Sequence, residues 1–379
     1  MGELKYRKAF DALKSEILSG KYTSRKSFPS LVATCARFKI SRLTAVKAFD
    51  KLKDEGLIST RVGAGTFVTK GAKSRFIGLV VPGISYSSEF FQPIIAELVR
   101  LARSRDYTIV MDGVWSPKSD DNGREAIEVA ARLIKRRVAG VIYQPLEYSE
   151  NSESINRRIL SAFSRAGIPV VLLDGDIVPG PTRSDYDLVS IDNVTAGEAL
   201  ATHLMERGAR NIRFLMRANW VENVRNRARG VRNEILAKGL RWSAKSVVME
   251  DPADASAVAK LMKSAPRPDA FVCENDVIAA DLMKTLGSLG YKIPDDVQIA
   301  GFDDVRVARL SSPGITTIHQ PCEGIARAAF DRLVARMSDR AIMPAHILLP
   351  YTLVIRGSTG VLTKTIRSTP SRSARKKHG

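Results

Sequence analysis

The sequence has little cysteine, little histidine and no long apolar run, and each shortage excludes a class of protein. Only three cysteines, Cys35, Cys273 and Cys322, occur among the 379 residues, far apart in the chain, so neither a disulfide framework nor a cysteine-rich metal site is expected. No stretch approaches the roughly 20 apolar residues that a membrane-spanning helix needs. The first 20 residues also lack the apolar centre of a signal peptide. We therefore predict a cytoplasmic protein that does not contact a membrane.

Signatures of catalysis are also missing from the sequence. The four histidines are scattered and have no His-x-Glu or paired-cysteine spacing of a zinc site. Neither a Gly-x-Ser-x-Gly elbow nor a phosphate-cradling Gly-Lys-Ser occurs. Asp174 and Asp176 form a close pair of carboxylates, but acids at a strand end are more often caps or hydrogen-bond acceptors for a ligand. We predict that the protein is not an enzyme and uses no cofactor and no metal.

Positive charge is abundant and is concentrated at the two ends of the chain. The net charge is +19, and residues 1–75 alone hold 17 basic and 6 acidic side chains. Residues 76–360 are nearly neutral, whereas residues 361–379 hold 6 basic and no acidic side chains. A small basic unit on a near-neutral body is typical of nucleic-acid binding confined to one domain. A basic surface kept for solubility or for an acidic partner is the alternative.

The first 70 residues have the pattern of a winged helix-turn-helix. Apolar residues from Tyr6 to Ile17 recur every three or four positions, which predicts an amphipathic helix. Ser30 and Ser41 are suited to cap two further helices, over 31–38 and from 42 to about 56. Two short strands around the turn Gly63-Ala64-Gly65 then predict a β-hairpin, the wing. In the third helix Arg42, Thr44 and Lys47 lie away from the apolar side, as major-groove reading requires.

This region resembles the winged helix of GntR-type bacterial transcription regulators. The resemblance depends on Pro29-Ser30, Ser41-Arg42, Thr44, Lys53–Ile58 and Gly63–Val68. The family places Glu-Arg-Glu after Pro-Ser, with the Arg on a phosphate, whereas this chain has Leu31-Val32-Ala33. That contact is then either absent or supplied by Arg37 or Lys39. The residues that we predict to contact DNA are Ser30, Arg37, Ser41, Arg42, Thr44, Lys47, Arg61, Gly63, Gly65 and Thr66.

From Phe76 onward, short apolar runs alternate with longer amphipathic stretches. The runs predict strands at 77–81, 107–111, 140–143, 170–173, 189–191, 212–216, 270–272 and 298–301. The stretches between them, such as 91–105, 124–136 and 196–207, predict helices. This alternation is typical of α/β parallel sheets with helices on both faces, and about 285 residues suit two doubly wound lobes. A ligand in such a fold binds beyond the carboxyl ends of the strands, in the cleft between two lobes.

Polar and aromatic residues follow several of the predicted strands and suit a polyhydroxylated ligand. Carboxylates, amides and arginine can hydrogen-bond hydroxyl groups, and an aromatic face covers the C–H side of a sugar ring. Each of these residues could instead cap a helix or a turn, Asp276 and Asp304 above all. Phe90 and Phe91 could equally belong to the core. The predicted effector-binding residues are Ser85, Phe90, Phe91, Gln144, Asp174, Arg227, Asn275, Asp303 and Gln320.

Residues 76–358 resemble the effector-binding region of LacI/GalR-type regulators, which have a periplasmic-binding-protein-like fold. The matching stretches are Ile77–Pro82, Asp192-Asn193, Arg227–Gly230, Asn275-Asp276, Ile293–Asp304, Ser312–Ile318 and the closing Leu349-Pro350 with Arg356. By analogy, all of the predicted effector-binding residues except Ser85 correspond to positions that contact the effector, with Phe90 and Phe91 as alternatives for one position. The linker lacks the leucine-bearing hinge helix of LacI-type proteins, so we expect no minor-groove kinking.

Together the two resemblances imply the architecture of arabinose-repressor-like transcription regulators. We predict a DNA-binding domain over 1–70, a linker over 71–75, a two-lobed effector-binding and dimerisation domain over 76–360, and a basic disordered tail over 361–379. The expected function is a homodimeric repressor that binds a double-stranded operator and responds to a small-molecule effector, by analogy a sugar. A cytoplasmic solute-binding or sensor protein without specific DNA recognition is the alternative, and an architectural chromatin protein is a third.

Overall fold

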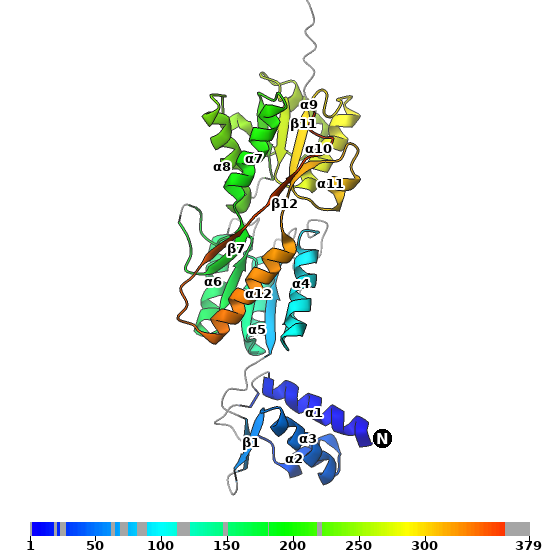
Figure 1. The fold of residues 1–379 in the computed structure, drawn as a ribbon, viewed down its shortest axis with the longest axis vertical. Helices are drawn as coiled ribbons and strands as arrows, with labels where there is room; N and C mark the ends of the chain where they lie inside the picture. Colours follow the sequence, from blue (N-terminus) through cyan, green and yellow to red (C-terminus); the bar gives the residue numbers. More distant parts are fainter. Residues whose placement is uncertain are drawn as a thin grey trace, which may run out of the picture. The chain divides into compact units, whose positions relative to one another are not determined.

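The computed structural model describes residues 2–360 except 19–20, 23–27, 62–64, 69–74, 82–88, 112–121, 147–150, 181 and 218–221. The chain divides into two units (Figure 1). The first unit comprises Met1–Asn193, Asn219–Asn226 and Gln320–Tyr351, and the second comprises Val194–Ala218, Arg227–His319 and Thr352–Gly379. The predicted tail and all of the predicted linker except Arg75 lie outside the described residues.

The N-terminal part of the first unit is a three-helix domain with a β-hairpin. Its elements are α1 (Gly2–Leu18), α2 (Leu31–Phe38), α3 (Arg42–Asp54), β1 (Ile58–Arg61) and β2 (Gly65–Val68). The two strands pair antiparallel, with Ile58 opposite Val68. One core buries Leu13, Phe49 and Leu52 together with Phe10 and Ile17 of α1. The helices and the hairpin agree with the prediction from the apolar spacing. The Ser30 and Ser41 side chains cap α2 and α3, as predicted.

The rest of the first unit is a six-stranded parallel sheet covered by helices on both faces. In spatial order its strands are β13 (His346–Leu349), β7 (Asp187–Ile191), β6 (Val170–Leu173), β5 (Gly140–Tyr143), β3 (Phe76–Val80) and β4 (Thr108–Val110). Its helices are α4 (Phe91–Ser104), α5 (Asn122–Lys135), α6 (Ser152–Arg165) and α12 (Cys322–Ser338). Helix α4 packs against α12, and α5 packs against α6 (Figure 1).

The second unit contains another six-stranded sheet, parallel except at one edge. Its strands in spatial order are β14 (Thr352–Val354), β12 (Thr316–His319), β11 (Gln298–Asp303), β10 (Ala270–Cys273), β8 (Ile212–Leu215) and β9 (Val247–Val248). Only β14 runs antiparallel to its neighbour. Its helices are α7 (Asn193–Glu206), α8 (Glu222–Ala237), α9 (Ala255–Met262), α10 (Asp276–Ser288), α11 (Arg306–Leu310) and the 3-10 turn η2 (Ala244–Ser246). Residues 222–226 at the start of α8 and Asn193 at the start of α7 belong to the first unit.

Two glycines let α7 and α8 approach each other closely in the second unit. A Cβ on Gly197 would lie 2.2 Å from the backbone oxygen of Arg227, and a Cβ on Gly230 would lie 1.9 Å from that of Val194. These distances are far below van der Waals contact, so only glycine fits at either position without moving a helix. The close crossing fixes the place of the N-terminal half of α8, which carries Arg227.

The prediction of two parallel α/β sheets is confirmed. All eight predicted strands occur, with ends that differ from the predictions by no more than two residues. The short strands β9, β12, β13 and β14 were not predicted. Among the described residues, no helix is both long and apolar enough to cross a membrane. Within the same residues, no group of three or more His, Cys, Asp or Glu side chains is arranged to hold a metal ion.

Candidate functional site

The first candidate site is the outer face of α3 in the N-terminal domain. Ala45, Ala48 and Phe49 are buried against the domain core, whereas Arg42 and Lys47 are exposed. No acidic residue occurs in the first turn of the helix, and Arg42 is its first residue. A positively charged first turn on an exposed helix is suited to the major groove of DNA, where arginine can donate two hydrogen bonds to guanine.

Three of the predicted DNA-contacting hydroxyl residues hold helix ends in place. The Ser41 hydroxyl accepts a hydrogen bond from the Thr44 backbone N–H at 3.3 Å, and its oxygen lies 2.8 Å from the Thr44 hydroxyl oxygen. The Ser30 hydroxyl accepts from the Ala33 backbone N–H at 3.1 Å. N-caps of this kind stabilise a helix by about 1 kcal/mol. These serines therefore set the start and the direction of α2 and α3.

Arg37 is engaged within the protein, in a cluster that joins α1 to α2. Its two terminal nitrogens donate to both carboxylate oxygens of Glu16, at 2.7 and 2.6 Å. Glu16 also accepts from the Lys21 ammonium and, at 3.1 Å, from the Tyr22 hydroxyl. The hydrogen bonds from Arg37, with those from Lys21 and Tyr22, lower the pKa of Glu16 to about 2. A phosphate contact by Arg37 remains a prediction. A phosphate would share the Arg37 guanidinium with the Glu16 carboxylate, to which both terminal nitrogens already donate.

The wing is partly described. Arg61 ends β1 opposite Gly65, the first residue of β2, while Gly63 lies outside the described residues. Gly65 has a φ of +97° and open space where a Cβ would be. The conformation rather than crowding therefore calls for glycine here. The Thr66 hydroxyl oxygen lies 3.3 Å from that of Thr60 on the neighbouring strand.

A second group of predicted site residues lies at the carboxyl ends of β5 and β6 in the first unit. Gln144 follows β5 and is 2% exposed, and its side-chain oxygen has no hydrogen-bond partner among the described residues. Asp174 follows β6, is also buried, and accepts a hydrogen bond from the Asn223 side chain at 2.5 Å. Its φ of +68° is uncommon for a residue other than glycine and occurs often at functional positions. Gln320, which follows β12, is fully buried.

Phe90 and Phe91 form an edge-to-face pair at the start of α4. Their ring centroids are 4.9 Å apart with an interplanar angle of 74°, and each residue is 6% exposed. The Phe90 carbonyl oxygen accepts from the Cys322 thiol at 3.7 Å. Both rings are thus part of the packing of this unit, which agrees with the core alternative and leaves a ligand contact as a prediction. Ser85 lies outside the described residues.

In the second unit, the buried side chain of Arg227 lies beside residues at the carboxyl ends of β10 and β11. Arg227 is 3% exposed, donates to the Glu274 backbone oxygen at 2.7 Å and lies 3.4 Å from an Asp303 carboxylate oxygen. Its guanidinium also lies over the Phe302 ring, 4.4 Å from the centroid. Asp303 ends β11 with a φ of +102°, so its backbone is strained where its side chain meets Arg227. A fixed donor beside a fixed acceptor is suited to neighbouring hydroxyl groups of one small molecule.

The acids beside this pair are held by the protein itself. Asp276 is fully buried and accepts from the Thr317 hydroxyl at 2.6 Å and from the Val305 N–H at 3.0 Å. Burial raises the pKa of Asp276 well above its usual value. The Asn275 side-chain oxygen caps α10 by accepting from the Ile278 N–H at 3.0 Å. The Asn275 amide nitrogen donates to a Glu274 carboxylate oxygen at 3.4 Å, so both ends of this side chain have a partner within the protein and a ligand contact remains a prediction.

Sequence reasoning missed two polar residues at these strand ends. Glu274 directly follows β10, is 1% exposed and accepts from the Arg217 N–H at 2.9 Å, and burial raises its pKa. Asn223, in the first turn of α8, holds the Asp174 carboxylate. The signal for Glu274 was its position, one residue before Asn275 and one after an apolar run. No signal pointed to Asn223, because its partner is 49 residues away.

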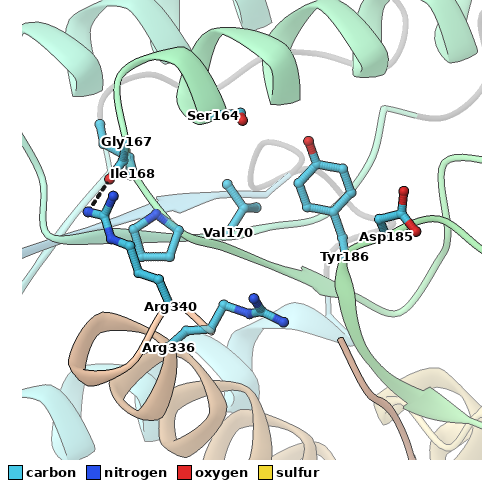
Figure 2. Close-up of a pocket in the computed structure, with 9 residues that line it drawn as sticks. Ser164, Gly167, Ile168, Val170, Asp185, Tyr186, Arg336 and Arg340 are labelled. Atoms are coloured by element: carbon cyan, nitrogen blue, oxygen red, sulfur yellow. Dashed lines mark hydrogen bonds between the residues drawn. The ribbon is translucent and has the colours of Figure 1, made fainter. Parts of the chain in front are cut away.

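A small pocket lies at the amino ends of β6 and β7 in the first sheet, and Figure 2 shows the residues that line it. It has a volume of about 190 Å³ and is lined by Ser164, Gly167, Ile168, Pro169, Val170, Asp185, Tyr186, Arg336 and Arg340. Pro169 and Val170 lie at the amino end of β6, and Asp185 and Tyr186 directly precede β7. None of the nine lining residues is a predicted effector-binding residue. Binding sites in sheets of this kind lie at the carboxyl ends of the strands, so we assign no effector to this pocket.

Two known families match separate parts of the chain. Residues 5–68 match the gntR family of bacterial regulatory proteins. Residues 201–359 match the periplasmic binding protein-like domain.

Several characterised proteins are similar to the chain over most of its length. The arabinose metabolism transcriptional repressor of Geobacillus stearothermophilus is 24% identical over 365 residues, which cover 94% of this chain and 97% of the relative. The HTH-type transcriptional repressor PurR of Photorhabdus laumondii is 28% identical over 282 residues, covering 72% and 77%. The first of these spans both matched regions of the chain.

Solved structures of transcription regulators have the same fold. A complex of the regulator CelR with cellobiose has a TM-score of 0.65 at 22% identity, covering 84% of this chain and 92% of that one. A LacI family regulator from Enterococcus faecium with bound ribose has a TM-score of 0.61 at 22% identity, covering 76% and 99%.

Proposed function

We propose that the chain is a transcription regulator and not an enzyme, because it joins a GntR-type helix-turn-helix region to a periplasmic-binding-protein-like region and because its relatives are named repressors. In this proposal it represses transcription from a specific operator until a sugar binds. The observation that carries this proposal is the combination, on one chain, of an exposed cationic α3 and a buried Arg227–Asp303 pair at strand carboxyl ends. The first suits a polyanion and the second suits hydroxyl groups.

We propose that DNA is contacted by the first turn of α3 and by the wing. Arg42 is the candidate for base reading because its side chain is exposed and its planar guanidinium can donate two parallel hydrogen bonds to a guanine. Lys47, one turn further, is the candidate for a phosphate contact. Ser30, Ser41 and Thr44 position these residues through the caps of α2 and α3. Arg37, Arg61, Gly63, Gly65 and Thr66 complete the proposed interface.

We propose that the effector is a sugar and that residues of both units contact it. Gln144, Asp174 and Gln320 belong to the first unit, whereas Arg227, Asn275 and Asp303 belong to the second. The Gln144 side-chain oxygen, which has no partner among the described residues, can accept a hydrogen bond from a hydroxyl group, and the Arg227 guanidinium can donate one. Related structures hold cellobiose and ribose, which supports this chemical class for the effector. Phe90 and Phe91 are the candidates for an apolar contact with a sugar ring.

The proposed regulation follows from binding energetics. A ligand that is contacted by residues of both units binds most tightly to the conformation of the protein in which all of those contacts form. Only this difference in affinity can shift the population of DNA-binding states. We propose that the protein is a homodimer, because two α3 helices would then read two half-sites one helical turn apart. Analytical ultracentrifugation of the full chain tests the dimer directly.

The decisive experiment combines selection of DNA with a ligand screen. Selection from random duplexes should enrich one pseudo-palindromic sequence, and affinity for it should fall steeply as salt rises. A thermal-shift screen against sugars and nucleosides should yield a compound that raises the melting temperature, since ligands stabilise by mass action. That compound should then weaken operator binding. A protein that binds a sugar but enriches no DNA sequence would instead be a solute sensor without specific DNA recognition.

A further inference from the structure

Leu43 is an exposed apolar residue in the middle of the proposed DNA-reading turn. It lies between Arg42 and Thr44 in the first turn of α3 and is 69% exposed. The apolar side of the helix, which includes Ala45 and Phe49, faces the domain core, so Leu43 does not contribute to that core. Its outward position is fixed, because Ser41 caps the helix one residue before Arg42.

The surroundings of Leu43 identify what can cover it. Lys47, one helical turn later on the same face, is exposed, and so is Arg42. A cationic face attracts a polyanion, whereas an apolar protein surface would have to desolvate these charges in order to reach Leu43. The major-groove edges of the bases present one apolar group, the C5-methyl group of thymine. A leucine flanked by an arginine and a lysine therefore matches duplex DNA with a thymine at that position.

We propose that Leu43 reads a thymine in the operator through contact with its C5-methyl group. This inference rests on the proposed function, because it requires α3 to enter the major groove. The contact has no hydrogen bond, so its contribution to affinity comes from removing two apolar surfaces from water. The contact gives a preference for thymine at the base that Leu43 touches, and it is separable from the contact of Arg42 because the two side chains recognise different groups.

The test removes the methyl group from the DNA and the side chain from the protein. The operator is first obtained by selection from random duplexes with the full chain. Each thymine is then replaced in turn by deoxyuridine, which lacks only the C5-methyl group, and dissociation constants are measured by fluorescence anisotropy. The proteins compared are the wild type, Leu43→Ala and Leu310→Ala. Leu310 is the matched control because it is 68% exposed and lies in α11 of the second unit.

At one or two thymine positions, deoxyuridine should weaken binding by the wild type and by Leu310→Ala about fourfold, the effect of one buried methyl group. Leu43→Ala should bind the thymine and deoxyuridine duplexes equally, and about as weakly as the wild type binds the deoxyuridine duplex. Alanine favours helix, so the variant should fold.

Three results overturn the inference while leaving the proposed function intact. They are an enriched operator with no thymine facing α3, a deoxyuridine series without effect on the wild type, and a deoxyuridine effect of equal size in Leu43→Ala. A selection that enriches no sequence has a different meaning, because it overturns the proposed function itself and this inference with it.

Discussion

The polar residues of the two candidate sites differ in their exposure to water. On α3, Arg42 and Lys47 are exposed, and the groups that position them are serine caps at the helix starts. At the strand ends of the second unit, Arg227 is 3% exposed and lies beside a carboxylate and over an aromatic ring. Exposed cations are screened by salt and suit a partner that carries many charges. Buried donors and acceptors that are held in place suit a neutral ligand whose hydroxyl groups can hydrogen-bond to them.

This contrast predicts that substitutions at the buried site affect folding and ligand binding together, whereas those on α3 affect DNA binding alone.

Arg227→Ala should have the largest effect, because it removes a buried cation that pairs with Asp303 and donates to the Glu274 carbonyl oxygen. Removing one partner of a buried ion pair costs about 3–5 kcal/mol of unfolding free energy. The variant should lose the effector response while its apo form still binds the operator. Urea unfolding and anisotropy with and without effector measure both effects. Arg309→Ala, an exposed site on α11, is the control and should behave like the wild type.

Gly230→Ala should destabilise the second unit by about 1–3 kcal/mol, because its Cβ overlaps the Val194 backbone and forces α7 and α8 apart. Effector affinity should fall too, since α8 carries Arg227. Gly287→Ala on α10 is the matched control: its Cβ meets nothing within 4 Å, and alanine favours helix. Differential scanning calorimetry compares the two. Equal melting temperatures for both variants would contradict the close helix crossing.

Arg42→Ala should reduce operator affinity by about 1–3 kcal/mol while leaving effector binding unchanged. Arg42→Lys sharpens the prediction, because it keeps the charge and removes the planar pair of donors. The lysine variant should therefore bind random duplexes like the wild type but bind the operator less tightly. Equal ratios of operator to random-DNA affinity in all three proteins would contradict base reading by Arg42.

Glu16→Gln should have the smallest effect, and the effect should depend on pH. Because the folded-state pKa of Glu16 is lowered to about 2, its carboxylate contributes stability above pH 4.5 that is lost as pH falls toward 2. Lys21 and Arg37 are half exposed, so screening limits the contribution to about 1–2 kcal/mol. Hydrogen exchange of peptides from α1 and α2 during urea titration measures it at neutral pH. Asp11→Asn, an exposed site on α1, should change little.

Much of the fold was predictable because the apolar periods are strong and the caps are local. Ser30 and Ser41 cap the helices that they precede, and the runs at 140–143 and 170–173 coincide with β5 and β6. The strands β12 to β14 have only three or four residues, and β13 and β14 lack the alternation of a half-buried strand. These strands form because they pair with strands distant in the sequence, and a short stretch of sequence carries no information about such partners.

The candidate sites were predictable as positions but not as roles. Strand order places Gln144, Asp174 and Asp303 at carboxyl ends, where the pattern predicted them. Whether a polar residue caps a helix or remains available to a ligand depends on neighbours distant in sequence. Asp276 accepts a hydrogen bond from Thr317, which is 41 residues away, and Arg37 donates to Glu16, which is 21 residues away. Asn275 shows the ambiguity most clearly, because its oxygen caps α10 while its amide nitrogen donates to a Glu274 carboxylate oxygen at 3.4 Å.

The division of the chain into interleaved segments has a consequence for its synthesis. The first sheet receives its edge strand β13 and its helix α12 from residues 322–349, long after the chain has supplied β3 to β7. A nascent polypeptide that stops at residue 193 would present the open side of β7, a template for pairing with other chains. Completion of this sheet therefore waits for the last tenth or so of the described chain to leave the ribosome.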